Sequence, residues 1–147
     1  MPNATALKFG YPHTLIAEHG PWLVLLRPKQ PTLGSLVLVC KEPATAFGQL
    51  SAEAFAALQP VVASIEAMLK ARVDYQRINY LMLMMVDPDV HFHVIPRYEP
   101  PREFGGQAFA DAGWPGPPVL DAAVTLADAQ RDALVAELRA LWKPITA

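Results

Sequence analysis

Apolar residues along this chain follow strand-like runs first and a helix-like period afterwards. Compact apolar runs at residues 22–26 and 35–40 are separated by Pro and Gly, a pattern that favours two strands joined by a turn. From Ser51 onward the apolar residues fall three and four apart, so a helix is predicted with Ser51 as its N-cap and Glu53 in its first turn. Pro60 should kink or split this helix, because proline lacks a backbone N–H.

A second pair of strands is predicted after this helix. Residues 79–85 and 89–98 are rich in apolar and β-branched side chains, and Asp87-Pro88 between them is a turn signal. They are therefore expected to form an antiparallel hairpin with a short connection. The methionines of the first strand favour core packing over a metal or redox patch, because thioether side chains usually fill gaps. These residues are Met82, Met84 and Met85.

The strand predicted at residues 89–98 carries unusual chemistry on one side. Successive side chains of a strand point to opposite faces, so Asp89, His91 and His93 share one face while the residues between them are apolar. His and Asp are poor choices for simply filling a sheet. The pattern therefore indicates a functional site more than a pair of structural histidines.

The rest of the chain changes composition sharply. Residues 100–118 are rich in Pro and Gly and are expected to wrap over the surface as a long loop docked by its aromatic residues. A last helix is predicted to start at Thr125, with Asp128 completing a capping box and Pro144 ending it. Its apolar stripe comprises Leu134, Leu138, Leu141 and Trp142.

Composition narrows the functional classes. The chain has 147 residues, 52% apolar and 18% charged with a net charge of −2, which fits one globular domain over 1–147. Lys and Arg are scattered, so no nucleic-acid or anionic-lipid partner is expected. Cys40 lies in an apolar run and should be a buried, inert thiol. There is no leader pattern and no window of about 18 uncharged apolar residues, so a soluble, cytoplasmic protein is expected.

The polar-faced strand resembles the signature of the histidine triad family, His-φ-His-φ-His-φ-φ with φ apolar. The matching residues are His91-Phe92-His93-Val94-Ile95-Pro96-Arg97. The predicted order of elements is also similar over about residues 15–100, with residues 101–147 as an extension. The resemblance implies an α+β fold with an antiparallel five-stranded sheet, one long helix after the second core strand and a C-terminal helix.

The resemblance also implies chemistry at the α-phosphate of a nucleotide. His91 takes the position of the nucleophile that forms a nucleotidyl-histidine intermediate, and His93 that of the phosphate contact and possible acid. Asp89 replaces the first histidine of the triad and is expected to orient the neighbouring ring. Dinucleoside polyphosphates or nucleoside phosphoramidates are the implied substrates, and no cofactor or metal is required.

The remaining site residues are assigned by position. Leu26, Arg27 and Ser35 match the region that holds the nucleoside in the family, although Arg27 stands where an Asn is usual. The stretch 84–86 offers no polar donor where many members bind phosphate, so other donors are expected. These are Asn79, Arg97 and Gln107. The resemblance further implies a homodimer, with the helix from Ser51 and the Trp-containing C-terminal segment as possible surfaces.

Two other functions compete with hydrolysis. Asp89, His91 and His93 supply nitrogen and oxygen ligands suited to Zn or Fe, although a strand spaces them in steps of about 6–7 Å and a fourth group would be needed. A noncatalytic nucleotide-binding domain is the other alternative, since the usual phosphate loop is missing.

Overall fold

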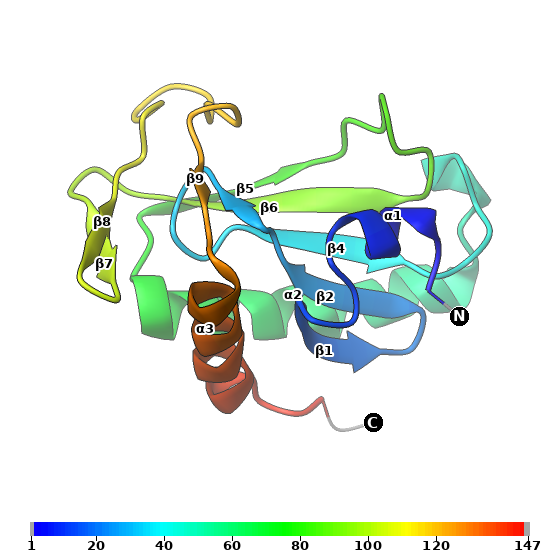
Figure 1. The fold of residues 1–147 in the computed structure, drawn as a ribbon. Helices are drawn as coiled ribbons and strands as arrows, with labels where there is room; N and C mark the ends of the chain where they lie inside the picture. Colours follow the sequence, from blue (N-terminus) through cyan, green and yellow to red (C-terminus); the bar gives the residue numbers. More distant parts are fainter. Residues whose placement is uncertain (1, 146–147) are drawn as a thin grey trace.

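The computed structural model describes residues 2–145 and has an α+β fold built on a five-stranded antiparallel sheet (Figure 1). The strands lie in the order β1-β2-β4-β6-β5. Their bounds are Leu15–His19 for β1, Trp22–Leu26 for β2, Leu36–Cys40 for β4, Arg77–Leu81 for β5 and His91–Arg97 for β6. The predicted fold class is confirmed, and β2 matches the predicted strand residue for residue.

Both faces of the central strands are buried, and a different segment covers each face. Helix α2 (Ala52–Val73) packs against one face, where the side chains of alternate residues in β2, β4 and β6 form the main core. Helix α1 (Ala4–Lys8) and the residues after it pack against the other face, over Leu23, Leu25, Val37 and Val39. Figure 1 shows α1 in front of β4, with α2 running behind the sheet. The alternation of side chains therefore decides which residues can reach the second face.

Helix α2 begins as the sequence predicts. The Ser51 hydroxyl accepts a hydrogen bond from the Ala54 amide at 3.0 Å, which caps the first turn. Pro60 lies inside α2 but does not split it. By length and composition alone α2 is apolar enough to cross a membrane, although it contains Glu66 and Lys70. Its buried residues recur at the helical period and face the sheet, as in a core helix.

The extension forms short strands outside the main sheet and then a helix. These elements are β3 (Lys29–Gln30), β7 (Arg102–Phe104), β8 (Gln107–Phe109), β9 (Val124–Thr125) and α3 (Asp128–Leu141), with a 3-10 turn η1 (Phe47–Gln49) before α2. β7 pairs with β8, and β9 pairs with β3 (Figure 1). Phe104 and Phe109 are buried in the main core, so the predicted docking of the extension by aromatic residues is confirmed.

Three local predictions are wrong, and one strand was not predicted. Strand β5 begins at residue 77 and ends at Leu81, and residues 82–90 form a long loop instead of a short turn at Asp87-Pro88. Met85 is 88% exposed in this loop and is not a core residue. Helix α3 begins later than predicted, since its N-cap is Ala127, whose amide donates to the Gln130 side chain. The edge strand β1 was not predicted from its apolar pattern.

Candidate active site

His91 and His93 lie side by side on the face of the sheet opposite α2. On the adjacent strand β4, Val39 pairs with His91 and Val37 pairs with His93, and both valines pack on this second face. The two imidazole centroids are 5.3 Å apart. Phe9, which follows α1, lies 6.2 Å from the His91 ring and 5.7 Å from the His93 ring. Only 2% of His91 and 7% of His93 is exposed, so the N-terminal segment covers the pair.

The His91 ring is oriented by the main chain. Its Nδ1 lies 2.7 Å from the carbonyl oxygen of Asp89. A carbonyl can only accept a hydrogen bond, so Nδ1 must carry the proton and donate it. In the neutral ring this leaves Nε2 with a free lone pair, which is the form a nucleophilic imidazole needs.

The side chain of Asp89 has a different role from the predicted one. Residue 89 lies before β6 begins, and its carboxylate does not contact the histidines. It accepts hydrogen bonds from the hydroxyl of Thr5 at 2.8 Å and from the Thr5 amide at 3.3 Å. The expected orienting effect on His91 therefore comes from the backbone of residue 89, while the carboxylate anchors α1.

His93 is held by Arg27, which follows β2. The Nε of Arg27 lies 3.5 Å from Nδ1 of His93, at the long end of the hydrogen-bond range. Because this Nε carries a hydrogen, Nδ1 of His93 is the acceptor and its Nε2 carries the proton. Burial and then the charge of Arg27 lower the pKa of His93 to about 4. His93 is therefore neutral at pH 7, and its Nε2–H can donate a hydrogen bond. The phosphate contact and acid role implied for His93 stay predictions.

A cavity of about 420 Å³ opens beside His93, and we call it the histidine cavity. Its lining includes three cationic and two anionic side chains, so its local charge is positive. These are Lys8, Arg27 and Lys29 with Asp87 and Asp121. The Lys8 ammonium lies 2.9 Å from the Asp87 carboxylate and links α1 to loop 82–90. Burial lowers the pKa of Arg27 and the Asp121 carboxylate opposes this shift.

Two residues of the predicted nucleoside pocket do not face this cavity. Leu26 is buried in the core beneath α2, because its position in β2 points its side chain to the opposite face. The Ser35 hydroxyl is fully buried and donates to the Thr32 carbonyl at 2.8 Å, so it closes the turn before β4. Only Arg27 of the three lies beside a histidine.

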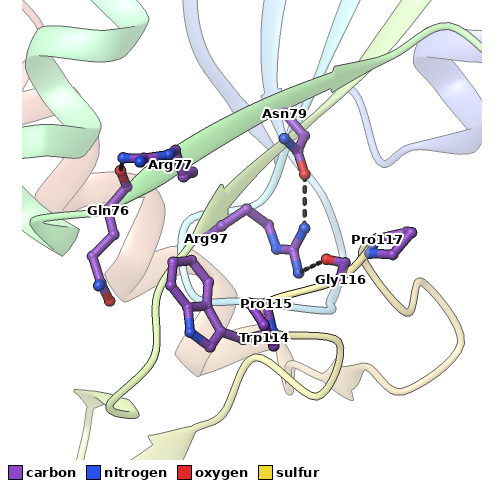
Figure 2. A pocket seen from close by; sticks show the side chains of 8 residues that line it. All are labelled: Gln76, Arg77, Asn79, Arg97, Trp114, Pro115, Gly116 and Pro117. Carbon is purple, nitrogen blue, oxygen red and sulfur yellow. Dashed lines mark hydrogen bonds between the residues drawn. The ribbon is translucent and has the colours of Figure 1, made fainter.

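The predicted phosphate donors lie elsewhere. Arg97 is buried at the far end of β6 and makes a bidentate pair with Asp111, at 2.7 and 3.2 Å. Its Nη1 donates to the Asn79 side chain at 2.8 Å (Figure 2). Gln107 is exposed on β8 and accepts from Gln130 of α3. None of these three lines the histidine cavity.

The structure does not assemble the ligand set of the metal hypothesis. The Asp89 carboxylate is turned toward Thr5, away from the histidines. Among residues 2–145, no group of three or more His, Cys, Asp or Glu side chains is arranged to hold a metal ion.

Sequence reasoning missed the N-terminal contribution to this site. Helix α1, which supplies Thr5 and Lys8 and is followed by Phe9, has only five residues and is too short to give a clear apolar period. The available local signal was Asn3, whose side chain accepts from the Ala6 amide and caps α1. Contacts between residues more than eighty positions apart then bring this helix onto the histidines.

Comparisons with known proteins support the fold. No family model and no curated protein matches the chain. Among solved structures, a histidine triad protein from Bradyrhizobium japonicum has a TM-score of 0.74 at 18% identity, covering 97% of this chain and 98% of its own. A histidine triad protein from Sinorhizobium meliloti has a TM-score of 0.68 at 21% identity, with 94% and 93% covered.

A third similar structure is a hypothetical histidine triad nucleotide-binding protein from Sulfolobus tokodaii. Its TM-score is 0.63 at 16% identity, and 87% of this chain and 82% of that chain are covered. At identities this low, the similarities show the fold and do not show the activity. By its sheet order, its long helix and these likenesses, the chain has the fold of the histidine triad proteins.

Proposed function

We propose that this protein is a nucleotide phosphate hydrolase or nucleotidyl transferase that acts through His91. The observation that carries the proposal is the opposite protonation of the two rings. The Asp89 carbonyl leaves His91 Nε2 free to attack, whereas Arg27 leaves His93 Nε2 with an N–H that can donate a hydrogen bond. Adjacent acceptor and donor nitrogens suit attack on a phosphorus atom whose oxygens need hydrogen bonds.

The proposed reaction has two displacement steps. In the first, the lone pair of His91 Nε2 forms a bond to the α-phosphorus, and the bond from phosphorus to the leaving group breaks. In the second, water attacks the same phosphorus, the N–P bond breaks, and the water gives up a proton to solvent. The nucleoside monophosphate is released and His91 returns to its starting form. An alcohol or phosphate in place of water would make the protein a transferase.

The charges of the histidine cavity support an anionic leaving group. Arg27, Lys8 and Lys29 surround the cavity and can stabilise negative charge that spreads over phosphate oxygens. His93 is neutral and cannot protonate an amine as it departs, because its pKa is lowered to about 4. Dinucleoside polyphosphates should therefore turn over faster than nucleoside phosphoramidates, since a nucleoside phosphate leaves as an anion without being protonated.

Access to His91 needs movement of the N-terminal segment. His91 is 2% exposed and does not line the histidine cavity, because Phe9 lies over both rings. Helix α1 is held by Thr5 on Asp89 and by Lys8 on Asp87. Both anchors are polar and partly accessible, so we infer that α1 opens to admit the nucleotide.

The decisive experiment traps the intermediate. The protein is incubated with diadenosine polyphosphates, quenched without acid and digested for mass spectrometry, and adenylylated His91 is expected. His91→Ala should lose turnover and the adduct, while His13→Gln, a change at an exposed histidine, should keep both. Turnover that survives His91→Ala would refute the nucleophile assignment. A chelator should leave the rate unchanged, because the proposed step uses no metal.

The burial of His91 also favours a second function, noncatalytic nucleotide binding. If α1 stays closed, a nucleotide can occupy the histidine cavity without meeting Nε2 of His91. This alternative predicts that AMP and diadenosine tetraphosphate raise the melting temperature without product formation. It also predicts that Arg27→Gln removes the stabilisation while His91→Ala keeps it.

We also propose that the protein forms a homodimer through the edge strand β5. Within residues 2–145, β5 pairs only with β6, so its other edge is open for a second copy. Exposed apolar side chains lie in loop 82–90 and on α2. They are Leu83, Met85 and Val86 in the loop and Phe55 on α2. The alternative surface at the C-terminal segment is less suited, because Trp142 packs against its own core.

A further inference from the structure

A second cavity lies at the end of the sheet near Arg97. Its volume is about 590 Å³, and it is lined by side chains of β5 and β6 and by residues 114–117 of the extension. Figure 2 shows the Arg97 guanidinium between Asn79 and Gly116, with a hydrogen bond to each, and the Trp114 ring beside Arg97. None of its lining residues also lines the histidine cavity, so it is a separate site.

Two polar side chains that line this cavity, Asn79 and Arg77, carry hydrogen-bond donors without an acceptor among the described residues. The Asn79 carbonyl oxygen accepts from Arg97 Nη1 at 2.8 Å, which fixes the orientation of the amide and leaves its NH₂ group free to donate. Arg77 is exposed at the rim and uses one nitrogen to bond the Gln76 carbonyl. Its other N–H groups have no acceptor among the described residues.

The charge balance of this cavity is positive. Arg97 is neutralised by the buried Asp111 carboxylate, which also accepts from the amides of Tyr98 and Gly113 and has no capacity left for a ligand. Among residues 2–145, the charge of Arg77 has no such partner, and no Asp or Glu lines the cavity. A donor-rich, acid-free cavity favours an anion.

The apolar wall adds a shape requirement. Trp114 is half-buried, and its ring lines the cavity close to Arg97 (Figure 2). An indole face favours a flat group stacked against it. Pro115 and Pro117 limit the backbone freedom of the facing segment, so this wall is preformed.

We propose that this cavity is a second ligand-binding site, for a small molecule that carries a phosphate or carboxylate on a flat ring. The anionic group bonds to the Asn79 NH₂ and to Arg77, and the ring stacks on Trp114. Asn79 pairs with Ile95 and Leu81 pairs with His93, so the site lies about 6–7 Å along the strand from the level of His93. The proposal does not depend on catalysis by His91.

The test is an NMR titration of the full-length protein with phenyl phosphate, benzoate and benzyl alcohol. We expect saturable shifts of the Asn79 side-chain amide and the Trp114 indole N–H with at least one anion. Comparing the dissociation constants of phenyl phosphate and benzoate shows which anionic group the cavity prefers. Benzyl alcohol should bind about tenfold more weakly or not at all, because it cannot form charge-assisted hydrogen bonds. Equal binding of the alcohol, or no shift with either anion, overturns the proposal.

Matched variants separate this site from general electrostatics. Asn79→Asp keeps an oxygen for Arg97 but replaces the two N–H donors by an acceptor, so it should abolish anion binding. Arg77→Gln should weaken binding about tenfold. Lys143→Gln removes the same charge from an exposed site after α3 and should have no effect. An equal loss with Lys143→Gln, or no loss with Asn79→Asp, contradicts the proposal.

The histidine variant distinguishes this proposal from the proposed function. His91→Ala should retain anion binding at Asn79 and Trp114 even though it loses turnover. Loss of the Asn79 and Trp114 shifts in His91→Ala would place the anion at the histidines and refute a separate site. Retained shifts in a protein that turns over no nucleotide would refute the hydrolase alone.

Discussion

Asp89→Ala separates the two contributions that residue 89 makes to the site. The backbone carbonyl that bonds His91 is retained in the variant, whereas the carboxylate that holds Thr5 is lost. If the carboxylate serves only to anchor α1, the variant keeps its nucleophile and opens more easily. Turnover should then rise instead of falling.

The magnitude follows from the two hydrogen bonds at Thr5. A hydrogen bond to a charged group contributes about 1.5–3 kcal/mol, and the contact is only partly buried, so about 1.5 kcal/mol is a reasonable loss. This corresponds to about a tenfold shift toward the open form. Because His91 is almost fully covered in the closed form, kcat/KM should increase by up to about tenfold.

The assay combines steady-state hydrolysis of diadenosine tetraphosphate with hydrogen exchange of residues 4–8. Faster exchange in this segment should accompany the gain in kcat/KM, and Thr5→Val should change both in the same direction. Asp132→Ala, at an exposed acid on α3, is the control and should change neither. A fall in kcat/KM of tenfold or more with unchanged melting temperature would mean that the carboxylate acts on the histidines, and the anchoring model would be wrong.

Three further predictions concern stability and assembly. The pKa of His93 is lowered to about 4, so the fold should be fully stable with respect to this group above pH 6.5 and should lose stability as the pH falls toward 4. The free energy of unfolding, measured by urea melts, should drop by about 3 kcal/mol over this window. In His93→Phe, the part of the drop that depends on His93 should vanish. Asp111→Ala leaves the buried Arg97 unpaired and should lower the free energy of unfolding by about 3–5 kcal/mol. Glu137→Ala, in the exposed pair with Arg72, should lower it by less than about 1 kcal/mol. Equal losses would contradict the expected difference between a buried and an exposed ion pair. Analytical ultracentrifugation should show a dimer, and Phe55→Glu should weaken the dimerisation affinity at least about tenfold. The control Lys143→Gln should leave the dimer intact. A wild-type monomer at high protein concentration would exclude the proposed interface.

Local signals carried the successful predictions of the fold. Strand β2, the cap at Ser51 and the shared face of His91 and His93 each depend on residues that are close in sequence. The side chain of Leu26 was misplaced because every residue of β2 is buried, so its composition does not show which face meets α2. Pro60 also remained within one helix, since packing of α2 on the sheet outweighs the local preference.

The errors in the site come from long-range contacts. Asp89 left the strand because its partner is Thr5, 84 residues away in the sequence. Arg97 was expected to bind phosphate, yet Asp111 of the extension neutralises it. Arg27 was assigned to the nucleoside pocket, and only the fold shows that it lies beside His93 and selects the tautomer of that ring. Such pairings have no periodic signature in the sequence.

The hydrogen bond from His91 to the Asp89 carbonyl has a consequence for how such proteins diverge. A carbonyl oxygen is present whatever side chain residue 89 carries, so the orientation of the His91 ring places no demand on the amino acid at that position. The side chain is then free to change its partner, and here it fastens the N-terminus over the site. A sequence signature that requires histidine at position 89 therefore tests a side chain that the orientation of the His91 ring does not use.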